Sequence, residues 1–202
     1  MQVFDIEQQS EEWFNLRRGC ITGTRLKLLM QKDISPLIDE IVAEIYSGQS
    51  KEVFINAEMQ RGIDLEPMAK HYYTENTFNQ VHEIGFCKSD KWHFLGLSPD
   101  GWVGHNGAIE IKCPDTKTHV RYIRENCLPK EYTYQIICYF LVNEDLEWLD
   151  FVSFDDRLSI KPIHIIRIER ETLKDDIHSI SFILDNFWTE VERVINLVKN
   201  GN

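Results

Sequence analysis

A short segment near the middle of the chain alternates between apolar and charged residues, and this alternation restricts the fold more than any other stretch. Residues 108–113 read Ala-Ile-Glu-Ile-Lys-Cys. Successive side chains of a β-strand point to opposite faces of the sheet. We therefore expect Ile109 and Ile111 to pack into an apolar core. Glu110 and Lys112 then share the opposite face of the same strand.

Helical and strand-like patterns surround this segment. The turn signal His105-Asn106-Gly107 leads into it and predicts a hairpin. Ser10 and Ser35-Pro36 are typical helix starts, each with serine as the N-cap. Helices are expected over residues 10–18, 23–30, 35–46, 56–74, 116–125, 130–143 and 171–199, and strands over 80–86, 92–98, 108–113, 147–154 and 162–169. This order predicts a mixed α/β (α+β) fold, with a central mixed β-sheet flanked by helices, in a single domain over residues 1–202.

Composition and cysteine usage place the chain among cytoplasmic globular proteins. Hydrophobic residues make up 43% and charged residues 27% of the 202 residues. Since no run of eighteen apolar residues occurs, we expect no membrane span. The acidic start lacks the apolar stretch of a signal peptide. Five cysteines without a CxxC pair predict free thiols, and because none follows Cys138 we expect no iron–sulfur cluster.

The charge distribution allows nucleic-acid binding despite an acidic total. The formal net charge of −11 argues against a simple nucleic-acid coat, because neutralisation of phosphates drives DNA affinity. Residues 112–130, however, contain five lysines and arginines against only Asp115 and Glu125. Residues 144–156 contain six acidic residues and no basic one. A basic inner face and an acidic outer face would reconcile these two observations.

Two carboxylates and a lysine are expected to converge beside the hairpin. Pro99-Asp100-Gly101 places Asp100 at a turn, from which the hairpin folds it back beside Glu110. Mg²⁺ prefers oxygen ligands, and Asp100, Glu110 and the backbone carbonyl of Ile111 supply them. Such a metal lowers the pKa of a bound water and screens charge on a phosphate. Lys112 could orient that water, or accept its proton if the pKa of Lys112 is depressed.

Alternative readings of these residues remain open at this point. Asp100, Glu110 and Lys112 could be solvated side chains on the outer face of a hairpin. Glu66 could be a further metal ligand, direct or through water, or an ordinary surface residue of an amphipathic helix. Most aromatic residues are expected in the core, although Tyr122 or Trp102 could instead touch DNA near the basic run. The seven histidines show no metal-ligand spacing.

The residues around the hairpin resemble a known family. Ser98-Pro99-Asp100-Gly101 followed by Glu110-Ile111-Lys112-Cys113-Pro114 resembles the PD-(D/E)xK nucleases, specifically the bacteriophage lambda exonuclease group of viral alkaline exonucleases, the YqaJ-like recombinase nucleases. Three further segments agree in order and spacing over roughly residues 10–170. They are Trp13 to Thr24 (W-x-x-L-R-x-G-x-I-T-A-S), Gly62 to Glu66 (G-x-x-x-E) and Tyr132 to Gln135 (Y-x-x-Q).

The resemblance implies a restriction-endonuclease-like core and a role for each matching residue. Asp100 and Glu110 would bind Mg²⁺, with Mn²⁺ as a possible substitute, and Lys112 would serve the attacking water. Glu66 would complete the metal environment, and Gln135 would line the active site. The resemblance assigns the 5′-phosphate of the degraded strand to three residues, whose hydroxyls, amides and guanidinium suit an anion: Arg17, Thr22 and Thr24.

The resemblance also implies an activity and partners. Members of the family digest one strand of linear duplex DNA from 5′ to 3′ and leave a 3′ single strand for recombination. The resemblance implies that members form a homotrimeric ring threaded by DNA and act with a phage single-strand annealing protein. A phage or prophage origin in a bacterial host follows. Two positions depart from the pattern: Gly23-Thr24 replaces Ala-Ser, and Ile137 replaces a second Gln, which puts the role of that position in doubt.

Two other functions compete with this one. A site-cleaving endonuclease of the same fold would use the same three catalytic residues. A non-catalytic DNA-binding module would have no need of Asp100, Glu110 and Lys112 together. On its residues alone, Arg17 would be read as an exposed arginine of a short helix, so its functional role rests on the resemblance.

Overall fold

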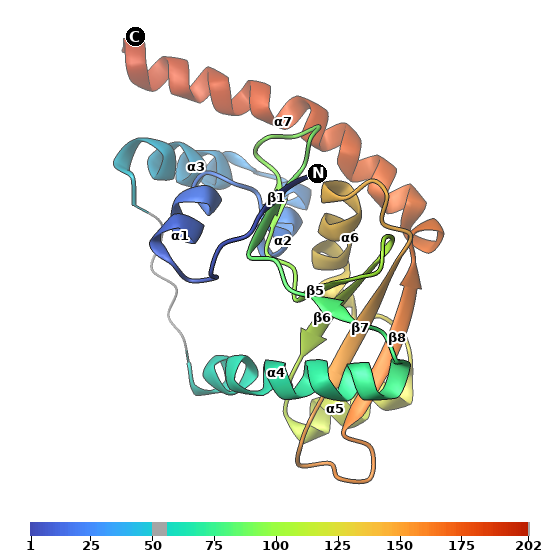
Figure 1. Ribbon diagram of the computed structural model, residues 1–202. Coiled ribbons are helices and arrows are strands. Elements are labelled where there is room, and N and C mark those ends of the chain that lie inside the picture. The colour runs from blue at the N-terminus through green and yellow to red at the C-terminus, as the bar shows by residue number, and fades with distance from the viewer. Residues whose placement is uncertain (50–55, 202) are drawn as a thin grey trace.

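The computed structural model describes residues 1–49 and 56–201 and shows two β-sheets surrounded by helices (Figure 1). The strands are β1 (Gln2–Phe4), β2 (Val81–His82), β3 (Phe86–Lys88), β4 (Gly96–Leu97), β5 (Gly101–Val103), β6 (Gly107–Lys112), β7 (Trp148–Phe154) and β8 (Ile163–Glu169). The α-helices are α1 (Glu11–Arg17), α2 (Gly23–Leu26), α3 (Ser35–Ser47), α4 (Ala57–Thr77), α5 (Thr116–Glu125), α6 (Thr133–Val142) and α7 (Lys174–Asn200). Short 3₁₀ turns cover Lys27–Met30, Lys130–Tyr132 and Arg170–Leu173.

The larger sheet has five strands in the order β2-β5-β6-β7-β8. Strands β6 and β7 are parallel, and the other neighbours are antiparallel. A parallel pair needs a crossover connection, which α5 and α6 supply. Strands β5 and β6 form the predicted hairpin, in which Val103 lies opposite Gly107 and Gly101 opposite Ile109. The central mixed sheet and its flanking helices confirm the fold class expected from the sequence.

The two faces of this sheet are covered by different helices. Figure 1 shows α4 crossing one face and α5 lying behind the strands. On the α4 side, Ala69 and Tyr73 pack with Ile109 and Ile111 in one apolar cluster. On the other side, Ala108 of β6 belongs to the larger core that contains α6 and the buried residues of α7. Strand alternation therefore sends Glu110 toward α6, as the sequence predicts.

The smaller sheet joins the N-terminal segment to the start of the hairpin. It has the order β1-β3-β4 and is antiparallel throughout. Next to it, Ile21 forms a parallel bridge with Leu95, with hydrogen bonds from the Ile21 N–H to the Phe94 carbonyl (2.7 Å) and from the Gly96 N–H to the Ile21 carbonyl (3.0 Å). This bridge brings the end of α1 and the start of α2 beside the residues that lead into β5.

An ion-pair network holds the connection between β6 and α5. The Arg61 guanidinium of α4 donates to the carbonyls of Cys113 (3.2 Å) and Pro114 (3.3 Å). It also pairs with the buried carboxylate of Asp155 at 2.8 Å. Arg157 pairs with Asp155 at 2.7 Å and donates to the Pro114 carbonyl at 3.1 Å. The turn that follows Lys112 is thus fixed from two sides.

Two of the expected strands are wrong in extent. The segment 80–86 is divided between the sheets, because Val81–His82 pairs with β5 and Phe86–Lys88 pairs with β1 and β4. In the segment 92–98 only Gly96–Leu97 is a strand. Its aromatic residues favour a strand by propensity, but they pack against α7 instead: Phe94 stacks on Trp188 with ring centroids 5.0 Å apart, and Trp92 Nε1 donates to Asp185 at 2.9 Å.

Helix boundaries differ from expectation in a few places. Ser10 is the N-cap of α1, as predicted, and accepts the Trp13 N–H at 3.2 Å. Ser35 is instead the first residue of α3, and the Asp33 carboxylate accepts its N–H at 2.9 Å. Helix α4 continues past residue 74 to Thr77. The sequence did not predict β1. The expected helices over 23–30, 130–143 and 171–199 each contain a 3₁₀ turn.

All five cysteines are free, as expected. None of the helices in residues 1–49 and 56–201 combines the length and the apolar character needed to cross a bilayer.

Replacement of Gly107 by alanine is expected to destabilise the hairpin, because a Cβ there would lie 2.1 Å from the Trp148 ring. The displaced indole should lower the free energy of unfolding by about 1–3 kcal/mol. Gly62→Ala in α4 is the matched control, since a Cβ there meets no atom within 4 Å. It should raise the same free energy by about 0.5–1 kcal/mol. Urea denaturation measures both variants, and equal effects of the two would contradict this packing.

Candidate active site

Glu110 lies in the sheet interior with both carboxylate oxygens bound by the protein. Its exposed fraction is 1%, and its side chain faces α6. Oε1 accepts a hydrogen bond from Gln135 Nε2 and pairs with Lys112 Nζ at 2.5 Å. Oε2 accepts a hydrogen bond from the Tyr139 hydroxyl at 2.7 Å. Because a buried carboxylate is costly unless it is paired and hydrogen-bonded, these three donors explain how Glu110 is held in the core.

Asp100 is brought beside Glu110 by the hairpin register. Gly101 pairs with Ile109, which sets the preceding Asp100 next to Glu110. Asp100 Oδ2 accepts the Ile111 N–H at 2.6 Å, and the Asp100 N–H donates to the Tyr139 hydroxyl oxygen at 3.1 Å. Burial, and then the negative charge of Glu110, raise the pKa of Asp100 well above its ordinary value. The buried Glu110 and the partly buried Asp100 thus lie side by side, and their negative charges repel each other.

Lys112 ends the strand on the same face as Glu110. Its ammonium lies 5.1 Å from the centre of the Tyr132 ring. Burial lowers the pKa of Lys112, but the charges of Glu110 and Asp100 outweigh it, so that the pKa of Lys112 is raised. The raised pKa favours hydrogen-bond donation by Lys112 over acceptance of a proton. Lys112 is a charged hydrogen-bond donor in this arrangement.

Glu66 lies on α4, at the edge of this site. Its carboxylate pairs with Lys70 at 2.8 Å, and Lys70 also pairs with Glu83 at 2.6 Å. The charge of Glu66 nevertheless contributes to the raised pKa of Asp100, after burial and the charge of Glu110. The structure thus sets Glu66 within electrostatic range of Asp100, with its carboxylate bound to Lys70.

The donor set fits a hard divalent cation in its chemistry. Within the described residues, no three His, Cys, Asp or Glu side chains converge as ligands. Asp100 and Glu110 offer two carboxylates, and the Ile111 carbonyl lies on the same strand as Glu110. A cation placed between Asp100 and Glu110 would relieve the repulsion that raises the pKa of Asp100. Oxygen donors with room for water are the environment that Mg²⁺ prefers.

Arg17, at the end of α1, is a partly buried cation close to this site. Its Nη1 donates to the Ser98 hydroxyl at 2.9 Å, and its guanidinium carbon lies 4.1 Å from the centre of the Trp13 ring. No carboxylate pairs with it among the residues that the structure describes. Burial lowers the pKa of Arg17 to about 10, which leaves the guanidinium charged at neutral pH. A partly buried cation without a counter-ion favours an anionic ligand.

A small pocket joins Arg17 to the residues that bind Glu110. Its volume is about 120 Å³. Gln135 and Tyr139 form one side, and both donate hydrogen bonds to Glu110. The structure therefore brings together the three residues that the resemblance assigned to a phosphate and the Gln135 assigned to the active site. The lining residues are Arg17, Thr22, Gly23, Thr24, Leu97, Ser98, Gln135 and Tyr139.

Two residues of the site were not assigned a role from the sequence. Tyr139 follows Gln135 by four residues and so lies on the same face of α6, which is the one signal that could have found it. Ser98 immediately precedes the Pro99-Asp100 turn, and its hydroxyl accepts hydrogen bonds from Arg17 and from Trp13 Nε1, the latter at 2.8 Å. Both act by holding other groups of the site in place.

Three residues with an open role are buried in the core. Trp102 has an exposed fraction of 6% and packs edge-on against Tyr139. Tyr122 packs against Phe151 and donates from its hydroxyl to Glu131 at 3.1 Å. The burial of both rings contradicts the suggested contact with DNA. Both residues belong to the core, as expected for most of the aromatic residues. Ile137 is fully buried, which leaves no site role at that position.

The chain is similar to a known protein family and to solved nuclease structures. The family described as the YqaJ-like viral recombinase domain matches residues 12–144. An alkaline exonuclease, LHK-Exo, from Laribacter hongkongensis has 35% identity and a TM-score of 0.80, over 94% of this chain and 98% of that chain. The structure of LHK-Exo in complex with dAMP has 35% identity and a TM-score of 0.79, over 92% of this chain and 96% of that chain. These matches confirm the resemblance to alkaline exonucleases.

A more distant structure agrees in fold. A phage-related exonuclease from Haemophilus somnus has 16% identity and a TM-score of 0.63, over 87% of this chain and 96% of that chain. No match was found among curated proteins.

Tyr139→Phe is expected to loosen the site while keeping the ring in the core. It removes the hydrogen bond to Glu110 Oε2 and leaves the partly buried Asp100 N–H without its acceptor. The free energy of unfolding should fall by about 1–3 kcal/mol. Tyr122→Phe is the matched control, because that buried ring gives its hydroxyl to a partly exposed carboxylate, and it should cost about 0.5 kcal/mol or less. Urea denaturation measures the free energy of unfolding of both variants. A loss for Tyr139→Phe no larger than for Tyr122→Phe would contradict the role of the Tyr139 hydroxyl in this site.

Proposed function

Because this chain belongs to the YqaJ-like viral recombinase family, we propose that it is a magnesium-dependent exonuclease acting on linear duplex DNA. In this proposal it digests one strand from a 5′-phosphorylated end, in the 5′-to-3′ direction, and leaves a 3′ single strand for recombination by annealing. One observation supports the proposal: the partly buried guanidinium of Arg17, which pairs with no carboxylate among the described residues, lines a pocket whose other wall is hydrogen-bonded to Glu110. An anion-binding pocket and a pair of carboxylates therefore adjoin.

The chemistry follows from the donors and acceptors of the site. Asp100, Glu110 and the Ile111 carbonyl would hold the metal ion, with Glu66 contributing through water. When bound, Mg²⁺, or Mn²⁺ in its place, would supply positive charge at the scissile phosphate and lower the pKa of the attacking water. Lys112, which is a charged donor, orients the water and stabilises negative charge on the phosphate oxygens. Gln135 and Tyr139 keep the Glu110 carboxylate in position.

The end preference follows from the pocket at Arg17. A terminal phosphate carries a charge of about −1.5 to −2 at neutral pH, whereas an internal phosphodiester carries a single charge. A partly buried guanidinium favours the more highly charged group. The hydroxyls of Thr22 and Thr24 line the same pocket and offer further hydrogen bonds to phosphate oxygens. A 5′-phosphate held there would set the first phosphodiester beside the carboxylates.

Assembly and partners follow the family resemblance and stay predictions. They comprise a homotrimeric ring around DNA, cooperation with a phage single-strand annealing protein, and a place in the cytoplasm of a bacterial host. Sedimentation of the purified protein measures the number of subunits, and a monomer at micromolar concentration would contradict the ring.

Glu110→Gln is expected to lower DNA hydrolysis at least about 100-fold, because a neutral amide cannot hold a divalent cation as a carboxylate does. The measurement follows release of nucleotides from linear duplex DNA with magnesium and then with chelator, which should stop the wild-type reaction. Glu192→Gln, at an exposed position of α7, is the control and should keep wild-type activity. A covalently closed circle should stay intact, since cutting it would identify an endonuclease. Full activity of Glu110→Gln would disprove the assigned site.

Arg17→Gln is expected to remove the preference for phosphorylated ends. The loss of a charge-assisted hydrogen bond of about 1.5–3 kcal/mol corresponds to roughly a 10- to 100-fold slower reaction on 5′-phosphate ends. The rate on 5′-hydroxyl ends should change little. Arg18→Gln is the matched control, because the guanidinium of this neighbouring residue donates to Asn15 at 2.9 Å, whereas it is Arg17 that lines the pocket. Equal losses on both kinds of end would place Arg17 outside the phosphate pocket.

A further inference from the structure

We propose that the outer face of α5 binds the phosphodiester backbone of the DNA next to the active site. This α5 basic face consists of Lys117, Arg121 and Arg124. The proposal rests on the proposed function, because it assigns a path to the substrate of that nuclease. It concerns phosphates outside the Arg17 pocket and away from the carboxylates.

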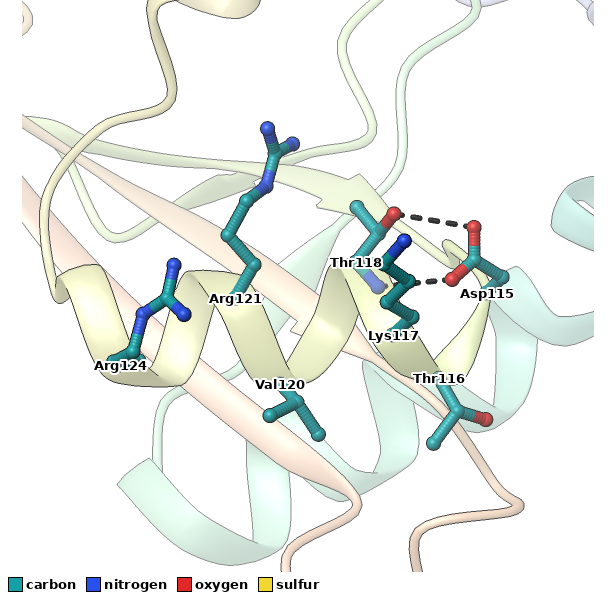
Figure 2. A pocket seen from close by; sticks show the side chains of 7 residues that line it. All are labelled: Asp115, Thr116, Lys117, Thr118, Val120, Arg121 and Arg124. Atoms are coloured by element: carbon teal, nitrogen blue, oxygen red, sulfur yellow. Dashed lines mark hydrogen bonds between the residues drawn. The ribbon is translucent and has the colours of Figure 1, made fainter.

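Helix geometry gathers the three cations on one side of α5. Positions 117, 121 and 124 are separated by four and three residues, which is the spacing of one helix face. Figure 2 shows their side chains rising from the same side of the helix. The buried residues of α5, His119 and Tyr122, lie on the opposite side and anchor the helix to the sheet. The basic face is therefore fixed toward solvent by the packing of its back.

The α5 basic face lines a groove of about 610 Å³. Lys117 forms no ion pair within the described part of the chain. Arg121 pairs with Glu131 at 2.8 Å and Arg124 with Glu125 at 3.1 Å, in each case between partly exposed side chains. Exposed ion pairs are worth about 0–1 kcal/mol, so both guanidinium groups can turn to another anion at little cost. The remaining lining residues are Asp115, Thr116, Thr118 and Val120.

The basic face adjoins the active site through two connections. Helix α5 begins four residues after Lys112, and the Arg61 network fixes the intervening turn. In addition, Glu131, the partner of Arg121, immediately precedes Tyr132, whose ring centre lies 5.1 Å from the Lys112 ammonium. A DNA strand that reaches the carboxylates thus has the α5 basic face beside it.

The size and charge of the face suit a run of phosphates. The seven steps along the helix from Lys117 to Arg124 span about 10 Å at 1.5 Å per residue. Phosphates of one strand follow each other at about 3.4 Å along a duplex axis, so the three cations can meet about three phosphates. In a chain with a net charge of −11, such a face concentrates the attraction for DNA at one place. Acidic surface elsewhere would repel DNA from unproductive contacts.

The test compares the salt dependence of DNA binding in two variants of equal charge. One is Lys117→Gln/Arg121→Gln/Arg124→Gln. The matched control, Lys174→Gln/Arg193→Gln/Lys199→Gln, removes three positive charges from α7. Fluorescence anisotropy measures affinity for a 5′-phosphorylated duplex and for a single strand, in chelator, between about 50 and 200 mM salt. Each lost phosphate contact lowers the slope of log affinity against log salt by about 0.9 on duplex or about 0.7 on a single strand.

We expect the slope of log affinity against log salt to be smaller in magnitude by about 2–3 for the α5 variant than for the α7 control. A loss on duplex only assigns the face to the duplex before digestion, and a loss on the single strand only assigns it to one separated strand. Slopes equal to those of the α7 variant on both substrates would overturn the proposal. Lys117 is exposed and forms no ion pair with another described residue, so Lys117→Gln alone should fold normally. Its slope should fall by about 0.7–0.9, which separates loss of a phosphate contact from misfolding of the triple variant. Failure of the proposed function would show separately, as wild-type protein that releases no nucleotides with magnesium.

Discussion

The burial of Ile109 and Ile111 against α4 determines how strand β6 is oriented, and the active site takes its geometry from that orientation. Once these two side chains face α4, Glu110 and Lys112 must face α6, because strand side chains alternate. The parallel neighbour β7 and the antiparallel neighbour β5 then fix the strand from both edges. A register slip of one residue would exchange the two faces and bury a lysine in the apolar cluster. Core packing and active-site geometry are therefore one constraint.

Much of this could be predicted from the sequence, because the signals are local. The alternation at 108–112 predicted the faces of β6, and the His105-Asn106-Gly107 turn predicted the hairpin that returns Asp100 to Glu110. The family resemblance added Arg17 and Gln135, and the structure brings both to one pocket. What these segments share is that their role depends on neighbours close in the chain or on a recognisable pattern.

The remainder could not be predicted, because it depends on contacts between distant segments. Ser98 belongs to the site because its hydroxyl accepts a hydrogen bond from Arg17 of α1, which lies 81 residues away in the sequence. Trp92 and Phe94 favour a strand by residue type, yet packing against α7 takes them out of the sheet. The charge state of Lys112 depends on the folded arrangement, because burial and two neighbouring carboxylates act on its pKa in opposite directions.

The hydroxyl of Tyr139 ties the active site to the depth of a core helix. One phenol accepts from the Asp100 backbone and donates to Glu110, while its ring is wedged against Trp102 in the interior. The spacing of the Asp100 and Glu110 carboxylates therefore depends on the distance between α6 and the sheet. Core substitutions that change the thickness of this layer will change the spacing of Asp100 and Glu110 without replacing either residue. The packing depth of α6 therefore determines the geometry of the carboxylate pair as well as that of the core.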